Sequence, residues 1–118
     1  MDYNHPLMKH AFKQVQEYTE NIDSILEIFD ENFAYAMFTF DFGLLKELIE
    51  KVNETISMID KYLSEQGQRY EELIERLKMF GVNDDSECLA LLWDLKRPVV
   101  YRVQKLNEYS EAIDKILT

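Results

Sequence analysis

Apolar residues recur every three or four positions along the first third of the chain, which is the spacing of one helix face. Asn4 is a suitable N-cap, and Pro6 is suited to the first turn of a helix. The pattern therefore predicts a helix from about Pro6 to Phe33. Its expected buried face consists of Met8, Ala11, Val15, Tyr18, Ile22, Ile25, Leu26, Phe29 and Phe33.

The next segment, Ala34 to Phe42, is rich in aromatic residues and contains neither glycine nor proline. One helix running through it would exceed about 60 residues, or roughly 90 Å, which a domain of this size could hardly bury. We therefore interpret the segment as a tight aromatic corner, with Thr39 or Asp41 capping the next helix.

From Phe42 onward the apolar residues step by alternating threes and fours, as in a heptad repeat. The same phase continues past Gly67, although glycine inside a helix costs about 1 kcal/mol. This favours one helix from about residue 40 to 80, with a break at Gly67 as the alternative. Its expected buried face is Phe42, Leu45, Ile49, Val52, Ile56, Ile59, Leu63, Tyr70, Leu73, Leu77 and Phe80.

Gly81 to Asp85 is the clearest turn signal, because Asp84 followed by Glu87 resembles a capping box. A last helix should begin near Asp85 and be kinked, or split, around Pro98. Its expected buried positions are Cys88, Leu92, Leu95, Val99, Val103, Leu106, Ser110, Ile113 and Leu117. The predicted fold is a single all-α domain over residues 1–118, an extended antiparallel bundle of three long helices, or four to five if Gly67 and Pro98 break them.

The composition is acidic, with a formal net charge of −10. Direct binding to nucleic acid or to an anionic membrane needs clustered Lys and Arg, so we expect neither, and a basic protein surface is the natural partner. No apolar stretch has the length of a signal peptide or a membrane span, so we expect a cytoplasmic protein. Cys88 is the only cysteine, which excludes an internal disulfide.

The negative charge concentrates between Lys13 and Lys46, where the chain has no Lys or Arg. Six of the acidic residues in this stretch fall within an arc of about 140° on the first predicted helix, opposite its apolar face. We predict that this acidic face binds a partner. It consists of Glu17, Glu20, Asp23, Glu27, Asp30 and Glu31.

The basic residues Lys96, Arg97, Arg102 and Lys105 form the only stretch with a clear positive excess. They are the internal competitor for the acidic face, either within the bundle or between subunits. Arg102 falls at a core position of its helix, and we expect its side chain to reach the surface rather than to meet a buried carboxylate.

Acidic pairs spaced by three residues raise the possibility of a metal-dependent enzyme, since helical metalloproteins hold ions with inward-facing carboxylates. Each pair here projects roughly opposite its helix's apolar face, and no Glu-x-x-His occurs. His5 and His10 are five apart, which does not place both rings on one face. We therefore predict no enzyme, no metal and no cofactor. The pairs are Glu17 with Glu20, Glu47 with Glu50, Glu72 with Glu75, and Glu111 with Asp114.

Two apolar groups remain. The aromatic residues between Phe29 and Phe42 form either a plug that closes the bundle end or a patch that docks a partner. Leu89, Trp93 and Val100 form a second stripe off the core face of the last helix, to be covered by another helix or another subunit. The candidate apolar binding residues are Tyr35, Phe38, Phe40, Leu89, Trp93 and Val100.

These observations predict a non-catalytic interaction module whose acidic face binds a basic surface of a partner protein. Its sharpest version is an inhibitor of phage or mobile-element type that mimics nucleic acid, because carboxylates about 5 to 6 Å apart along a helix roughly match phosphate spacing. The alternatives are a chaperone or assembly factor that binds an amphipathic segment through an aromatic patch, and a structural homo-oligomer such as a homodimer built on the heptad run.

Overall fold

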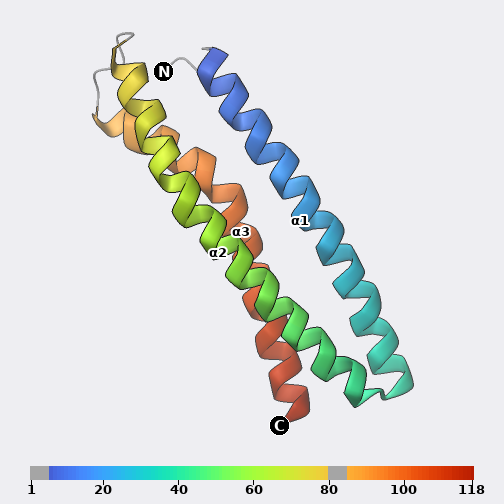
Figure 1. Ribbon diagram of the computed structural model, residues 1–118. Coiled ribbons are helices and arrows are strands. Elements are labelled where there is room, and N and C mark those ends of the chain that lie inside the picture. Colours follow the sequence, from blue (N-terminus) through green and yellow to red (C-terminus); the bar gives the residue numbers. More distant parts are fainter. Residues whose placement is uncertain (1–5, 80–84) are drawn as a thin grey trace.

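The computed structural model describes residues 6–79 and 85–118, with side chains for all of these except 85–88. It contains three helices, α1 (Pro6–Thr39), α2 (Phe42–Lys78) and α3 (Asp85–Leu117), and no strand among the described residues. Figure 1 shows α1 and α3 running in one direction and α2 in the other. The bundle measures 59 × 21 × 18 Å. The predicted extended all-α bundle of three antiparallel helices is confirmed.

The predicted end of the first helix at Phe33 is wrong, because α1 continues to Thr39. Only Phe40 and Asp41 connect it to α2. Phe40 has a φ of 54°, in the left-handed region, and the Asp41 N–H donates to the Ala36 carbonyl at 2.9 Å. This 6→1 bond with a left-handed residue before it is a Schellman motif, in which the reversing position is usually glycine. The aromatic corner is therefore a helix end and a two-residue turn.

Asp41 also begins α2. Its Oδ1 accepts a hydrogen bond from the Leu44 N–H at 3.0 Å, which satisfies one of the free amides of the first turn. The prediction of Asp41 as the cap is confirmed. Thr39, the other candidate, donates its hydroxyl back to the Tyr35 carbonyl at 2.8 Å and belongs to α1.

Neither Gly67 nor Pro98 breaks its helix. α2 is continuous through Gly67, as the unbroken heptad phase indicated, and the Lys96 side chain of α3 lies 3.7 Å from where a Cβ would stand. α3 is likewise continuous across Pro98, as one helix with Pro98 inside it, so the alternative of a split there is wrong. Most of the predicted turn from Gly81 to Asp85, the predicted cap Asn4 and the predicted core positions of Phe80 and Cys88 lie outside the described residues and side chains.

The predicted apolar faces meet along the bundle axis, except that Phe42, predicted to be buried, is 52% exposed. Core positions such as Val52, Leu95 and Leu106 have no exposed surface. Several residues just outside the predicted stripes are also buried, because each helix contacts two neighbours and needs a wider apolar face than a two-helix seam. These additional buried residues are Leu48, Thr55, Ile74 and Leu91.

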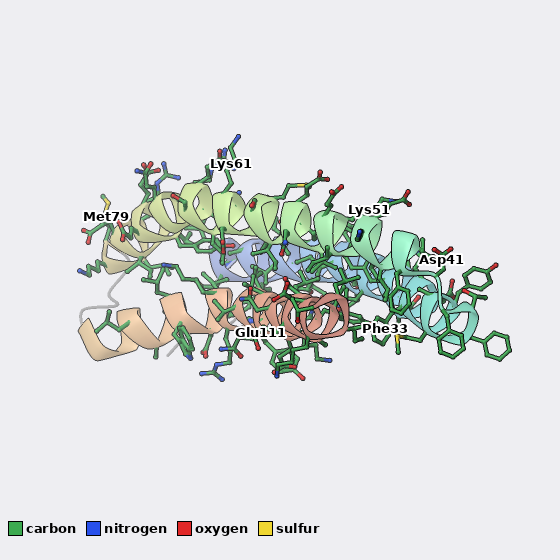
Figure 2. The ribbon with its side chains drawn as sticks, turned by 90° about the horizontal axis from the view of Figure 1, so that it is seen from below. Phe33, Asp41, Lys51, Lys61, Met79 and Glu111 are labelled. Atoms are coloured by element: carbon green, nitrogen blue, oxygen red, sulfur yellow. The ribbon has the colours of Figure 1, made fainter. Side chains whose placement is uncertain are left out.

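Side-chain contacts set the register of the three helices. Tyr18 of α1 stacks on Tyr62 of α2 with ring centroids 3.6 Å apart, and Ser110 of α3 donates to Asn53 of α2 at 2.8 Å. Two contacts between α1 and α3 each join residues 79 positions apart, as parallel helices require. Figures 1 and 2 show the end of the α1–α2 hairpin lying to one side of the C-terminal end of α3. Among the described helices, none has both the length and the apolar character that crossing a bilayer requires.

Candidate functional site

Four of the six predicted acidic residues form an open surface on α1. Glu17, Glu20, Glu27 and Glu31 are all exposed, and none forms an ion pair with another described residue. At about 1.5 Å per residue they span roughly 21 Å of the helix. From here on, the name acidic face is restricted to these four residues, without Asp23 and Asp30. No Lys or Arg lies between Gln14 and Leu45, so no basic residue of this stretch neutralises it.

Asp23 is used inside the bundle instead. Its two carboxylate oxygens accept hydrogen bonds from Nε and Nη2 of Arg102 at 2.8 and 2.9 Å, a bidentate pair between α1 and α3. The Arg102 Nη1 also donates to the Pro98 carbonyl at 2.9 Å. The hydrogen bond from Arg102 is the main cause that lowers the pKa of the Asp23 carboxyl. The preferred expectation, that the Arg102 head reaches the surface, is wrong, and the alternative of pairing with the acidic helix within the bundle is confirmed for Arg102.

Asp30 is also used within the bundle. The Tyr109 hydroxyl of α3 donates to Asp30 Oδ1, and the Tyr109 ring stands edge-on to Phe33 with centroids 5.5 Å apart. Burial raises the pKa of the Tyr109 hydroxyl, and the hydrogen bond to Asp30 raises it further. A pocket of about 400 Å³ lies at this junction, lined by Leu26, Asp30, Phe33, Lys105, Glu108, Tyr109 and Ala112. Asp30 is therefore exposed, but its carboxylate is hydrogen-bonded to α3.

The end of the helical hairpin carries four exposed rings, which we call the aromatic tip: Tyr35, Phe38, Phe40 and Phe42. Their exposed fractions are 61%, 86%, 78% and 52%. Of the six rings weighed as a plug, only Phe29 is buried and Phe33 half-buried. Figure 2 shows Asp41 at the end of the hairpin. The plug interpretation is wrong because four of the six rings are exposed rather than packed in the end of the bundle.

The second predicted stripe lies at the opposite end of the molecule, on the first half of α3. Leu89 is 68% exposed and Trp93 is 48% exposed, whereas Val100 is half-buried. The Arg97 guanidinium lies 5.8 Å from the Trp93 ring centre, a cation–π distance, and 3.4 Å from Asp94. The structure therefore separates the two predicted apolar groups and joins only the tip to the acidic face.

Sequence reasoning missed two exposed apolar residues of α1, Ile28 and Met37. Ile28 is 55% exposed and precedes Tyr35 and Phe38 by seven and ten residues, a spacing that puts all three on one helix face. The sequence did contain a signal for this exposure, because Ile28 lies outside the arc of α1 residues that were predicted to be buried. Met37 is 41% exposed. Tyr101, exposed by 53%, was also missed, and the Lys105 ammonium stands 5.1 Å from the Tyr101 ring centre.

The acidic pairs that raised the possibility of metal chemistry all have exposed side chains. Within residues 6–79 and 85–118, no group of three or more His, Cys, Asp or Glu residues is arranged to hold a metal ion. Comparison with known proteins finds no matching family model, no similar curated protein and no similar solved structure.

Proposed function

We propose that the protein is a non-catalytic interaction module whose acidic face binds a basic surface of a partner protein. The observation that carries the proposal is the surface of α1 from Glu17 to Phe38, which is exposed, holds no positive charge and joins carboxylates to aromatic rings. Interfaces of this kind use aromatic residues as anchors and charged residues to select the partner. The proposal places this interaction in the cytoplasm.

The electrostatic part of the binding comes from four carboxylates rather than six. Asp23 and Asp30 are hydrogen-bonded to α3, so the carboxylates with no bond to another helix are Glu17, Glu20, Glu27 and Glu31. Exposed charges interact over about 8 Å at physiological ionic strength, and added salt shortens this range. Binding should therefore weaken strongly with salt and be fast at low salt.

Inhibition by nucleic-acid mimicry is the sharpest form of this proposal. A mimic has to present a row of negative charges that a phosphate-binding surface can follow. The acidic face provides such a row at both of its ends, but Asp23, near its middle, is paired with Arg102. A DNA-binding enzyme would be a suitable partner if its phosphate-binding lysines match two separate pairs of carboxylates.

The experiment compares three baits in an extract of cells that make the protein, at low and at high salt. The first bait is the unchanged chain. The second has the acidic face neutralised, and the third has the same number of charges removed from exposed positions on α2. The neutralised variant is Glu17→Gln, Glu20→Gln, Glu27→Gln and Glu31→Gln, and the control is Glu47→Gln, Glu50→Gln, Glu54→Gln and Glu71→Gln.

Both variants change the net charge by four, so any effect of overall acidity is equal in the two. The proposal expects a protein that the unchanged chain and the α2 control retain at low salt and that the neutralised variant loses. A protein retained equally by all three baits, or no specific protein at all, contradicts the proposal.

Self-association is a second candidate, favoured by the exposure of Leu89 and Trp93. Lys96 and Arg97 lie beside this stripe, so two copies meeting there would avoid the strongly acidic surface of α1. Analytical ultracentrifugation tests it. A dimer mass that Trp93→Ser reduces to the monomer mass supports a homodimer, and a monomer mass for the unchanged chain excludes it.

A further inference from the structure

Phe40 occupies a position for which its side chain is poorly suited. Its φ of 54° lies in the region that a Cβ disfavours, and glycine would form the same Schellman motif without strain. The ring is 78% exposed, so it gains little burial in return. A bulky residue that is both strained and exposed contributes little to the fold, which indicates that the ring serves another purpose.

The rings around Phe40 form a patch of considerable size. With about 200 Å² for each aromatic side chain, the exposed fractions leave on the order of 550 Å² of the tip open. Patches on soluble monomers seldom exceed about 600 Å², and the largest are often functional. A stable interface takes about 800 Å² from each partner, so the tip needs adjoining surface to complete it.

The adjoining surface is acidic. Glu31 precedes Tyr35 by four residues and Phe38 by seven, so the three side chains share one stripe of α1 with Ile28. Glu27 borders this stripe and Asp41 lies in the turn, and all three carboxyl side chains are exposed. The complete surface is therefore an apolar strip with Glu31 within it, Glu27 at one side and Asp41 in the turn.

Charge and secondary structure select the occupant. A second copy would place the same carboxylates opposite each other, and an anionic bilayer would repel them. The tip consists of helix ends and a two-residue turn, so it offers no open sheet edge for a strand. A helix with apolar residues on one side and Lys or Arg along its flanks matches both the rings and the carboxylates.

We propose that the aromatic tip and the adjoining residues Ile28 and Glu31 of α1 bind a basic amphipathic helix of the partner protein. This inference rests on the proposed function and adds the chemistry of the partner. It assigns Phe38 and Phe40 as the anchors and Glu27 and Glu31 as the groups that meet the flanking Lys or Arg. The helix lies along the end of α1 and over the turn.

The test uses a fluorescent synthetic peptide of three heptads, with Leu at the two core positions of each heptad and Lys on both flanks. A second peptide has Glu in place of every Lys, and a third has the Lys peptide's composition in scrambled order. Fluorescence anisotropy measures binding to the unchanged chain and to Phe38→Ser and Phe40→Gly. Met58→Ser is the matched control, since Met58 is 65% exposed beside Glu54 on α2, far from the tip.

We expect the unchanged chain to bind the Lys peptide and neither of the other two. Phe38→Ser and Phe40→Gly should each weaken binding at least tenfold, and Met58→Ser should change it less than twofold. Phe40→Gly should at the same time raise the thermal midpoint, which separates a lost contact from a damaged fold. Circular dichroism measures that midpoint.

Several results overturn this inference: no binding of the Lys peptide, equal binding of the Glu or scrambled peptide, or unchanged binding by both tip variants. A dimer that Phe38→Ser converts to a monomer assigns the tip to a second copy, and co-sedimentation with phosphatidylcholine vesicles assigns it to a membrane. If the tip variants bind normally and the variant with a neutralised acidic face does not, the proposed function stands without this inference. If that variant also binds normally, both fail.

Discussion

The pair between Asp23 and Arg102 gives the sharpest prediction about what holds α1 on the bundle. The perturbation is a double-mutant cycle with Asp23→Asn, Arg102→Met and both together. At the roughly 4 Å between the charge centres of such a pair, two unit charges attract by about 4 kcal/mol at an effective dielectric constant of 20. The Asp23 side chain is 49% exposed, so water screens much of this attraction.

Exposed pairs couple by at most about 1 kcal/mol, and two parallel hydrogen bonds strengthen a pair beyond that level. Arg102 is only 21% exposed and donates to Asp23 through two nitrogens. We therefore expect a coupling free energy of about 1.5 kcal/mol, from general magnitudes for partly buried bidentate pairs.

Urea unfolding followed by circular dichroism gives the four free energies of unfolding that the cycle needs. Lys61 and Glu65 are the control pair, since their side chains are 78% and 63% exposed and their charged atoms are 3.9 Å apart. That pair should couple by less than about 0.5 kcal/mol. A coupling between Asp23 and Arg102 no larger than the control's would refute the reasoning and return Asp23 to the set of residues open to a partner.

Three further predictions concern stability. Arg102 lowers the pKa of the Asp23 carboxyl in the folded chain below its value in the unfolded chain, so the pair stabilises the fold above the unfolded pKa and this stabilisation is lost as pH falls. Urea midpoints measured between pH 2 and 7 should show the loss of stability. The variant Asp23→Asn should lack this part of the pH dependence. Phe40→Gly should stabilise the chain by about 1 kcal/mol and raise the thermal midpoint by roughly 4 °C, since it relieves a left-handed backbone. Leu95→Ala, at a fully buried site, should cost about 3 kcal/mol in urea unfolding, whereas Leu89→Ala, 68% exposed, should cost less than about 0.5 kcal/mol.

Each of these has a clear contrary result. An unchanged acid profile in Asp23→Asn would mean that its carboxyl titrates alike in the folded and unfolded chain. A less stable Phe40→Gly would mean that the ring supports the fold. Equal costs for the two leucines would contradict the assigned packing face of α3.

The fold could be predicted from the chain wherever one local signal decides the outcome. The heptad phase of α2 runs through Gly67 without a shift, and this was enough to favour one helix. Asp41 was recognisable as a cap because an aspartate precedes an apolar helical run. The end of α1 was placed six residues early because the chain reverses at Phe40, where the usual glycine signal is absent.

The candidate surface depended on information that the pattern of one helix does not contain. The periodicity of α1 placed Asp23 and Glu27 on the same polar face. Which of them meets Arg102 depends on the rotation of α1 and its register against α3. The exposure of the aromatic tip depends in the same way on how the three helices pack at that end of the bundle.

The most direct test of the account is site-specific photocrosslinking of the α1 surface in cells that make the protein. A photoreactive amino acid replaces Ser24, which is exposed among the glutamates of the acidic face, or the matched exposed Ser57 of α2. The account predicts a crosslinked partner protein from position 24 and not from position 57, with the crosslink falling within a Lys-rich or Arg-rich segment. Equal crosslinking from both positions, or none from position 24, would contradict it.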